Sequence, residues 1–115
     1  ASDALGLDMK ALCFEENDKL DLTEYTQAAL VTTTLAMTRV VEEHGIHADM
    51  TAGLSLGEYS AIAAAGGMTE IDAIRLVRKR GILMQNTVPA GEGAMCAVMA
   101  MDAAKIEEVT GPIDG

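Results

Sequence analysis

The segment Gly53-Leu54-Ser55-Leu56-Gly57 places a serine between two glycines, directly before a helix-forming run. This Gly-x-Ser-x-Gly pattern is typical of a sharp turn from a strand into a helix, where the serine hydroxyl is exposed and the glycines avoid clashes. Ser55 is therefore a candidate nucleophile. The backbone N–H of Leu56, at the start of the helix, could donate to the oxyanion of a tetrahedral intermediate. The five residues are equally compatible with a structural serine in a small-residue turn.

The second feature with chemical potential is Arg80. On a helix that advances about 100° per residue, Arg80 points within about 60° of an apolar group of side chains. That group consists of Ala73, Leu76, Val77, Leu83 and Met84. Arg78 falls about 160° from Arg80, whereas Arg75 and Lys79, about 140° and 100° away, are expected to be solvated. Arg80 is thus predicted to lie in the middle of the apolar face.

A guanidinium that faces inward is costly unless a carboxylate or a phosphate meets it. One interpretation of Arg80 is a pocket for the free carboxylate of a substrate. The alternatives are a structural ion pair with an internal acid and a side chain whose stem is buried while its head reaches water.

These residues need elements to position them. The apolar run 48–54 predicts a short strand before the serine, and the small residues of 58–65 predict a buried helix that ends at Gly66-Gly67. Thr69 and Asp72 predict a capped helix that ends before Pro89. A buried strand over 94–101 and a helix from Asp102 to Val109 complete an α/β pattern. Because two strands do not make a stable sheet, the chain is expected to be incomplete.

The first half of the chain is predicted to be helical. Residues 1–16 favour short helical pieces, and a long helix capped by Asp21 or Thr23 is expected to end at Gly45. His44 in its last turn and His47 in the following loop are assigned structural roles, because no nucleophile is expected within one hydrogen bond of either.

Composition excludes several classes of function. A net charge of −10 argues against a broad surface for nucleic acid or for an anionic membrane. Two cysteines without a Cys/His cluster predict neither a disulfide framework nor a zinc site, and they suit a cytoplasmic protein. No apolar stretch is long enough to span a membrane, and the amino end lacks a signal pattern.

Several segments together resemble the malonyl-CoA:acyl carrier protein transacylase family. They are Thr26-Gln27-x-Ala-Leu30, Ala52-Gly53-Leu54-Ser55-Leu56-Gly57-Glu58-Tyr59-Ser60-Ala61, Arg75-Leu76-Val77, Arg80-Gly81-x-x-Met84-Gln85 and Gly93-Ala94-Met95. The match covers nearly the whole chain in the order of the family. Acyltransferase domains of polyketide synthases are similar but fit the Gly-Glu-Tyr-Ser-Ala run slightly less well.

The resemblance implies transfer of a malonyl group from malonyl-CoA to the phosphopantetheine thiol of an acyl carrier protein in fatty acid synthesis, through an acyl-serine intermediate. It implies that Ser55 carries the acyl group, that Leu56 supplies an oxyanion N–H and that Arg80 pairs with the malonyl carboxylate. Gln27, Leu54 and Met84 are expected to bind substrate. Neither a metal nor a bound cofactor is expected, and the complete protein is expected to be a monomer in the cytoplasm.

In fold, the resemblance implies that residues 1–92 belong to a hydrolase-like α/β core and that 93–115 begin a ferredoxin-like subdomain. The chain departs from the family in two respects. Leu54 stands where the family most often has histidine. The amino-terminal Gly-Gln-Gly-x-Gln segment and the catalytic histidine are absent, and neither His44 nor His47 matches that histidine. An α/β serine esterase, a polyketide-type acyltransferase and an inactive fragment remain alternatives.

Overall fold

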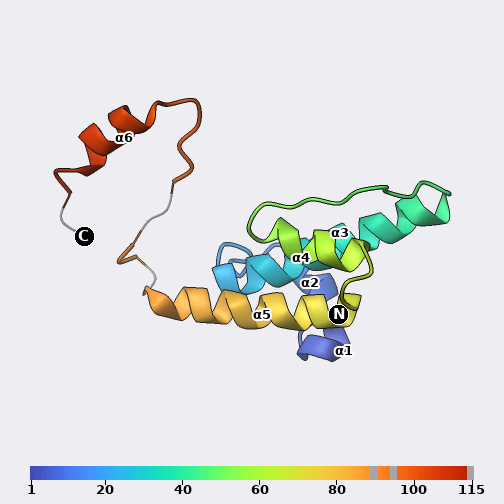
Figure 1. The fold of residues 1–115 in the computed structure, drawn as a ribbon. Coiled ribbons are helices and arrows are strands. Elements are labelled where there is room, and N and C mark those ends of the chain that lie inside the picture. The colour runs from blue at the N-terminus through green and yellow to red at the C-terminus, as the bar shows by residue number, and fades with distance from the viewer. Residues whose placement is uncertain (89–90, 94–95, 114–115) are drawn as a thin grey trace.

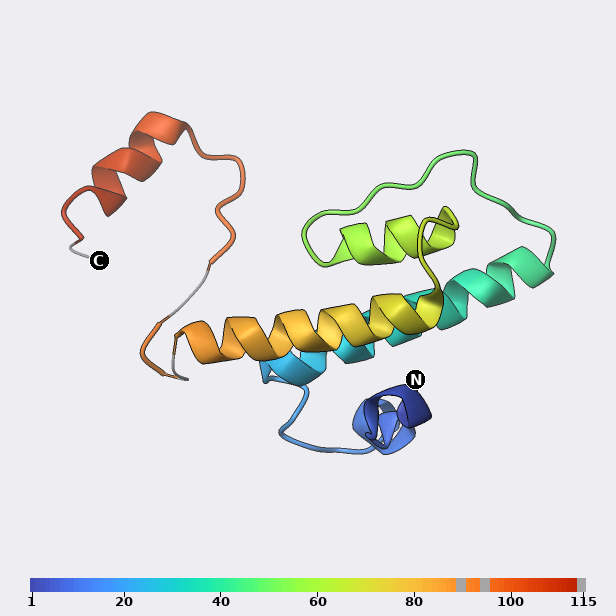
Figure 2. The same ribbon diagram turned by 60° about the horizontal axis from the view of Figure 1, so that its bottom comes forward.

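The computed structural model describes residues 1–88, 91–93 and 96–113. Its centre is a pair of long antiparallel helices, α3 (Thr23–Glu43) and α5 (Glu70–Thr87), which lie side by side in both ribbon views (Figures 1 and 2). Helix α4 (Gly57–Ala64) packs against both, while α1 (Ser2–Leu5) contacts α5 and α2 (Met9–Phe14) contacts α3. Helix α6 (Ala103–Thr110) lies apart from this bundle, near the carboxyl end (Figure 1).

Helical periodicity in the apolar residues explains why α3 and α5 pair. Val31 and Leu35, one turn apart on α3, are buried against Ala73, Ile74 and Val77 of α5. A second buried group joins α2 to α3 and consists of Met9, Leu12, Ala28 and Ala29. Both groups include residues of α3, which is therefore the helix around which the bundle is organised.

Gly81 sets the distance between α3 and α5. A Cβ atom at this position would lie 2.8 Å from the Cα of Glu24 and 2.8 Å from the carbonyl oxygen of Thr23. Because both are backbone atoms, a side chain at residue 81 would push the helices apart. The glycine thus lets the first turn of α3 contact the backbone of α5 next to Arg80.

The helix ends match the sequence patterns in part. The Thr69 hydroxyl accepts a hydrogen bond from the Asp72 N–H at 3.1 Å, so the predicted cap of α5 is confirmed, and α3 ends at Glu43 before Gly45, as expected. The predicted cap of α3 is wrong: its N-cap is Leu22, without a side-chain bond. The physical reason is tertiary, since Gln85 of α5 accepts from the first amide of α3, that of Thr23, at 3.0 Å.

The predicted strands are absent from the described residues. Residues 48–54 and 96–101 are irregular, and residues 94–95 of the second expected strand lie outside the described part. A strand requires a neighbouring strand to pair its backbone N–H and C=O groups, and these segments do not meet a partner. The α/β expectation is therefore corrected for this chain, whose described residues form helices and loops. The expected burial of α4 is found only in part: Ser60 is buried, while Tyr59 and Ala63 are partly buried against the core.

Candidate active site

The turn that carries Ser55 is a backbone feature that depends on glycine. Ser55 has a φ of 52°, in the left-handed region that few non-glycine residues adopt, and its side chain is exposed. A Cβ atom on Gly53 would lie 2.1 Å from the carbonyl carbon of Gly57. Gly53 is therefore required where the chain folds back on itself. The same expectation for Gly57 is wrong, because a Cβ there would meet no atom within 4 Å.

Leu56 directly follows the serine and is the N-cap residue of α4. Its N–H donates to no group of the described residues, whereas the next amide, that of Gly57, donates to the Leu54 carbonyl at 2.9 Å. An unused N–H at the positive end of a helix suits a developing negative charge. The geometry of Leu56 is thus compatible with the predicted oxyanion donor.

Arg80 connects three elements at the site. Its Nη2 donates to the Ser55 hydroxyl at 2.9 Å, and its Nη1 donates to the side-chain oxygen of Gln27 at 2.7 Å. The guanidinium also lies over the ring of Tyr59, 5.7 Å from the centroid. The structure therefore brings together α3, the serine turn and α4 around one cation.

The surroundings of Arg80 differ from the predicted apolar face. Leu76 and Leu83 are exposed, and the buried residues of α5 are Ala73, Ile74, Val77 and Gly81. Arg80 consequently lies at the border of the packed face and is half-buried. None of the ion pairs among the described residues involves Arg80. The alternative of a structural ion pair is thus not realised in the described part of the chain.

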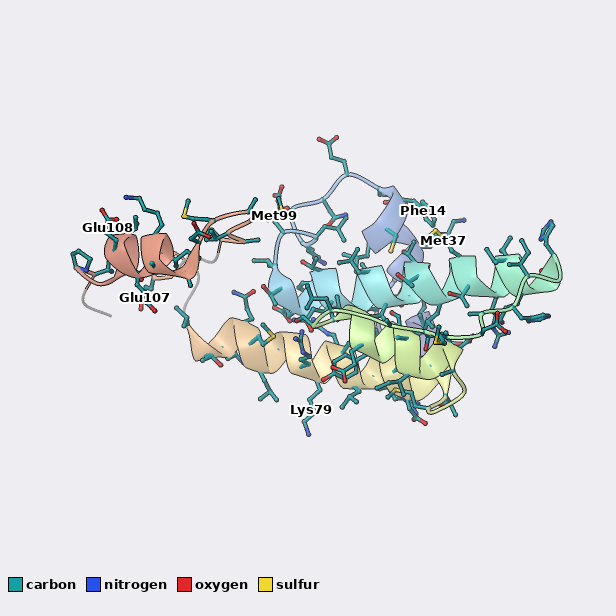
Figure 3. All side chains as sticks on the ribbon, turned by 45° about the horizontal axis from the view of Figure 1, so that its top comes forward. Phe14, Met37, Lys79, Met99, Glu107 and Glu108 are labelled. Atoms are coloured by element: carbon teal, nitrogen blue, oxygen red, sulfur yellow. The ribbon has the colours of Figure 1, made fainter. Side chains whose placement is uncertain are left out.

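The neighbouring cations divide into two kinds. Arg75 and Lys79 are exposed as expected, and Figure 3 shows Lys79 extending from α5 away from α3. Arg78, by contrast, pairs with the Glu24 carboxylate at 2.9 Å. Among the described residues, Arg78 and not Arg80 is therefore the cation of α5 that meets a carboxylate. The helical angle correctly predicted that the two arginines point in different directions. It gave no information about α3, which contacts both.

The other predicted substrate-binding residues have different surroundings. Gln27 is buried, and its amide nitrogen lies 3.3 Å from the Met84 sulfur, so both residues border Arg80. Leu54 is 92% exposed next to Ser55. Tyr59 was not singled out from the sequence. Its position was the available signal, because Tyr59 lies in the first turn of the helix that directly follows the serine turn.

Neither histidine is hydrogen-bonded to the serine. His44 is the C-cap residue of α3, and its Nδ1 lies 2.8 Å from the Val40 carbonyl oxygen. His47 is exposed in the loop that follows. The hydrogen bond at His44 agrees with the structural role assigned to it, and the Ser55 hydroxyl has Arg80 as its single hydrogen-bond partner among the described residues.

Two other kinds of site are absent from the described ranges. No group of three histidine, cysteine, aspartate or glutamate side chains there could hold a metal ion. No helix there is both long and apolar enough to cross a membrane.

The Gly53 contact leads to a first prediction. In the complete protein, Gly53→Ala is expected to lower the rate of a reaction in which Ser55 is the nucleophile by on the order of 100-fold. The reason is that the added methyl group displaces the serine turn by about an ångström or more. Gly57→Ala is the matched comparison and is expected to cost less, since its methyl group has space. Steady-state rates and thermal melting would be measured for both. Equal losses of activity would contradict the role given to Gly53.

Comparison with known proteins gives one consistent result. A family model described as "Acyl transferase domain" matches residues 3–113. A malonyl CoA-acyl carrier protein transacylase of Bacillus subtilis is 48% identical over 111 residues, which are 96% of this chain and 35% of that protein. The corresponding protein of Escherichia coli K12 is 47% identical over 108 residues, 92% of this chain and 35% of its own length. The chain thus spans about a third of the relatives that it matches.

Solved structures agree with these matches. The malonyl CoA-acyl carrier protein transacylase of Coxiella burnetii superimposes with a TM-score of 0.86 at 42% identity, over 96% of this chain and 36% of that one. A malonyl-transacylase in complex with its type II PKS acyl-carrier protein superimposes with a TM-score of 0.85 at 43% identity, over the same shares. The bundle described above therefore corresponds to about a third of these folds.

Proposed function

Since this chain belongs to the acyl transferase domain family, we propose that it carries the nucleophile and the carboxylate-binding arginine of a malonyl-CoA:acyl carrier protein transacylase. The substrates of the complete protein are then malonyl-CoA and the phosphopantetheine thiol of an acyl carrier protein in fatty acid synthesis. Ser55 is the nucleophile and Arg80 binds the free carboxylate of the malonyl group. Leu56 supplies one oxyanion donor, while Gln27, Leu54 and Met84 border the substrate.

The observation that carries this proposal is the 2.9 Å contact between Arg80 and the Ser55 hydroxyl. In a malonyl group esterified to Ser55, the free carboxyl carbon lies three bonds from Oγ, a span of roughly 4 Å. A guanidinium already in contact with Oγ reaches that carboxylate by a small rotation. Arg80 has no carboxylate partner among the described residues, so the substrate would supply the missing anion.

The reaction follows from these positions in two steps. The Ser55 oxygen attacks the thioester carbon while its proton passes to a base outside this chain, and the thiolate of coenzyme A leaves. The carrier protein's thiol then attacks the acyl-serine ester, and the serine hydroxyl is restored. The N–H of Leu56 would stabilise the oxyanion formed in each step, and Arg80 would hold the malonyl group by its far end.

The proposal is tested by comparing two substrates on the complete protein. Malonyl-CoA with holo acyl carrier protein should give malonyl transfer, measured as the malonylated carrier protein by mass spectrometry. A neutral ester, which lacks the carboxylate, should be hydrolysed slowly or not at all. Efficient hydrolysis of the neutral ester without transfer of malonate would instead indicate an α/β serine esterase.

One observation favours a second candidate role. The similar structure with a TM-score of 0.85 is a malonyl-transacylase bound to a type II PKS acyl-carrier protein. The same chemistry would then deliver malonyl groups to polyketide synthesis. Parallel assays with carrier proteins of the two kinds separate these roles, because the malonyl group should be transferred faster to the preferred carrier protein.

The division of the chain is part of the same proposal. Residues 1–92 would belong to an α/β core, in which 48–54 pairs with strands supplied by the rest of the protein, and residues 93–115 would begin a ferredoxin-like subdomain. The position of α6 apart from the helical bundle supports this boundary (Figure 2).

A further inference from the structure

Arg78 lies two residues before Arg80 on α5 and makes a different set of contacts. Its Nη1 donates to the backbone carbonyl of Glu24, and its Nη2 lies 2.9 Å from the carboxylate of the same residue. Its guanidinium also lies 4.4 Å from the centroid of the Tyr25 ring. The paired side chains are only 16% and 26% exposed, so this interaction is better shielded from solvent than a surface ion pair.

Two further contacts act on the same turn of α3. The Thr23 N–H donates to the Gln85 side chain, and the backbone at Thr23 and Glu24 touches α5 at Gly81. The Gly81 contact sets the distance between the helices but does not by itself prevent one from sliding or rotating on the other. A forked guanidinium that holds one residue by both backbone and side chain restricts both motions.

Gln27 connects this turn to the active site. It follows Glu24 by three residues, so its side chain lies nearly one helical turn farther along α3. Its side-chain oxygen accepts from Arg80 Nη1 at 2.7 Å, which leaves Nη2 directed at Ser55. The register of α3 against α5 therefore decides where the guanidinium of Arg80 points.

We propose that Arg78 is a positioning residue: by fixing the first turn of α3 against α5, it holds Gln27 where it orients Arg80 toward the malonyl carboxylate. This inference rests on the proposed transacylase function. Arg78 does not contact the substrate, and its effect reaches the reaction through Gln27 and Arg80.

A second ion pair between the same helices provides a matched control. Arg39 of α3 and Glu70 of α5 meet at 2.7 Å near the other end of the helix pair. Their side chains are 66% and 35% exposed, and the hydrogen bond to Glu70 raises the pKa of Arg39 above its usual value. Arg39→Met removes an interhelical ion pair far along the helix from Gln27, so it tests whether any lost ion pair has the same effect.

The experiment compares Arg78→Met, Arg78→Lys and Arg39→Met in the complete protein, with malonyl-CoA and acetyl-CoA as alternative substrates. Arg78→Met should lower kcat/KM for malonyl transfer by about tenfold and that for acetyl transfer much less, because acetyl has no carboxylate to orient. Arg78→Lys should keep more of the malonyl preference than Arg78→Met, since the positive charge remains. It should keep less than the wild type, because the forked guanidinium is lost. Arg39→Met should leave the preference unchanged.

A double variant decides whether Arg78 acts through Arg80. If it does, adding Arg78→Met to Arg80→Ala changes the malonyl preference no further. If Arg78→Met lowers only the melting temperature, or lowers kcat/KM for malonyl and acetyl transfer by the same factor, Arg78 is merely structural and the inference is overturned. If the wild-type protein shows no malonyl transfer, the proposed function fails first. The two failures are thus distinguishable.

Discussion

Ser55→Ala in the complete protein is expected to lower malonyl transfer by roughly 10⁴-fold or more. The reason is that no acyl-serine intermediate can form, and removal of a nucleophile that acts together with a base and oxyanion donors costs several powers of ten. Rates of malonyl transfer to holo carrier protein would be measured for the wild type and the variant. Thermal melting is expected to change little, because Ser55 is exposed and leaves no cavity when truncated.

Ser60→Ala is the control for this prediction. Ser60 belongs to the same short segment but forms no hydrogen bond with Ser55 or Arg80 in the described part of the chain, so transfer should persist. A Ser55→Ala protein that keeps wild-type rates would mean that another residue carries the acyl group.

Arg80→Ala is expected to change the choice of substrate. A hydrogen bond to a charged group is worth about 1.5–3 kcal/mol, which corresponds to a loss of ten- to a hundredfold or more in malonyl transfer. Acetyl-CoA has no carboxylate, so its transfer should change much less. The ratio of kcat/KM for malonyl-CoA to that for acetyl-CoA measures the effect.

Lys79→Ala is the matched control for Arg80→Ala. Lys79 precedes Arg80 on α5, and its side chain extends into solvent away from α3 (Figure 3). Its removal should leave the malonyl preference intact. Were Arg80→Ala to slow malonyl and acetyl transfer by the same factor, Arg80 would act through the structure of the site and not through the carboxylate.

The extent to which the sequence predicts this structure depends on the range of the interactions involved. Local signals worked well: Thr69 caps α5 through Asp72, and α3 stops before Gly45. Local signals failed where a distant residue replaced them: Asp21 or Thr23 was expected to cap α3, but the first amide of α3, that of Thr23, donates to Gln85 instead. The expected strand 48–54 failed for a related reason, since strand formation depends on neighbours that a local pattern does not supply.

The site shows the same division between local and distant interactions. The bend at Ser55 follows from the glycine spacing, and its positive φ and the tight space at Gly53 agree with it. The helical angle separated Arg80 from Arg78 but could not identify either partner, because Gln27 and Glu24 lie more than fifty residues earlier. Gly81 offered an unused signal, since glycine inside a long helix often marks close approach of another backbone.

Intact-mass spectrometry of the complete protein would show whether Ser55 becomes malonylated. After brief mixing with malonyl-CoA and acid quenching, the mass should rise by one malonyl group, and peptide mapping should locate that group on Ser55. The Ser55→Ala protein should acquire none. An adduct on a different residue of the wild type, or an equal adduct on the Ser55→Ala protein, would mean that Ser55 is not the nucleophile.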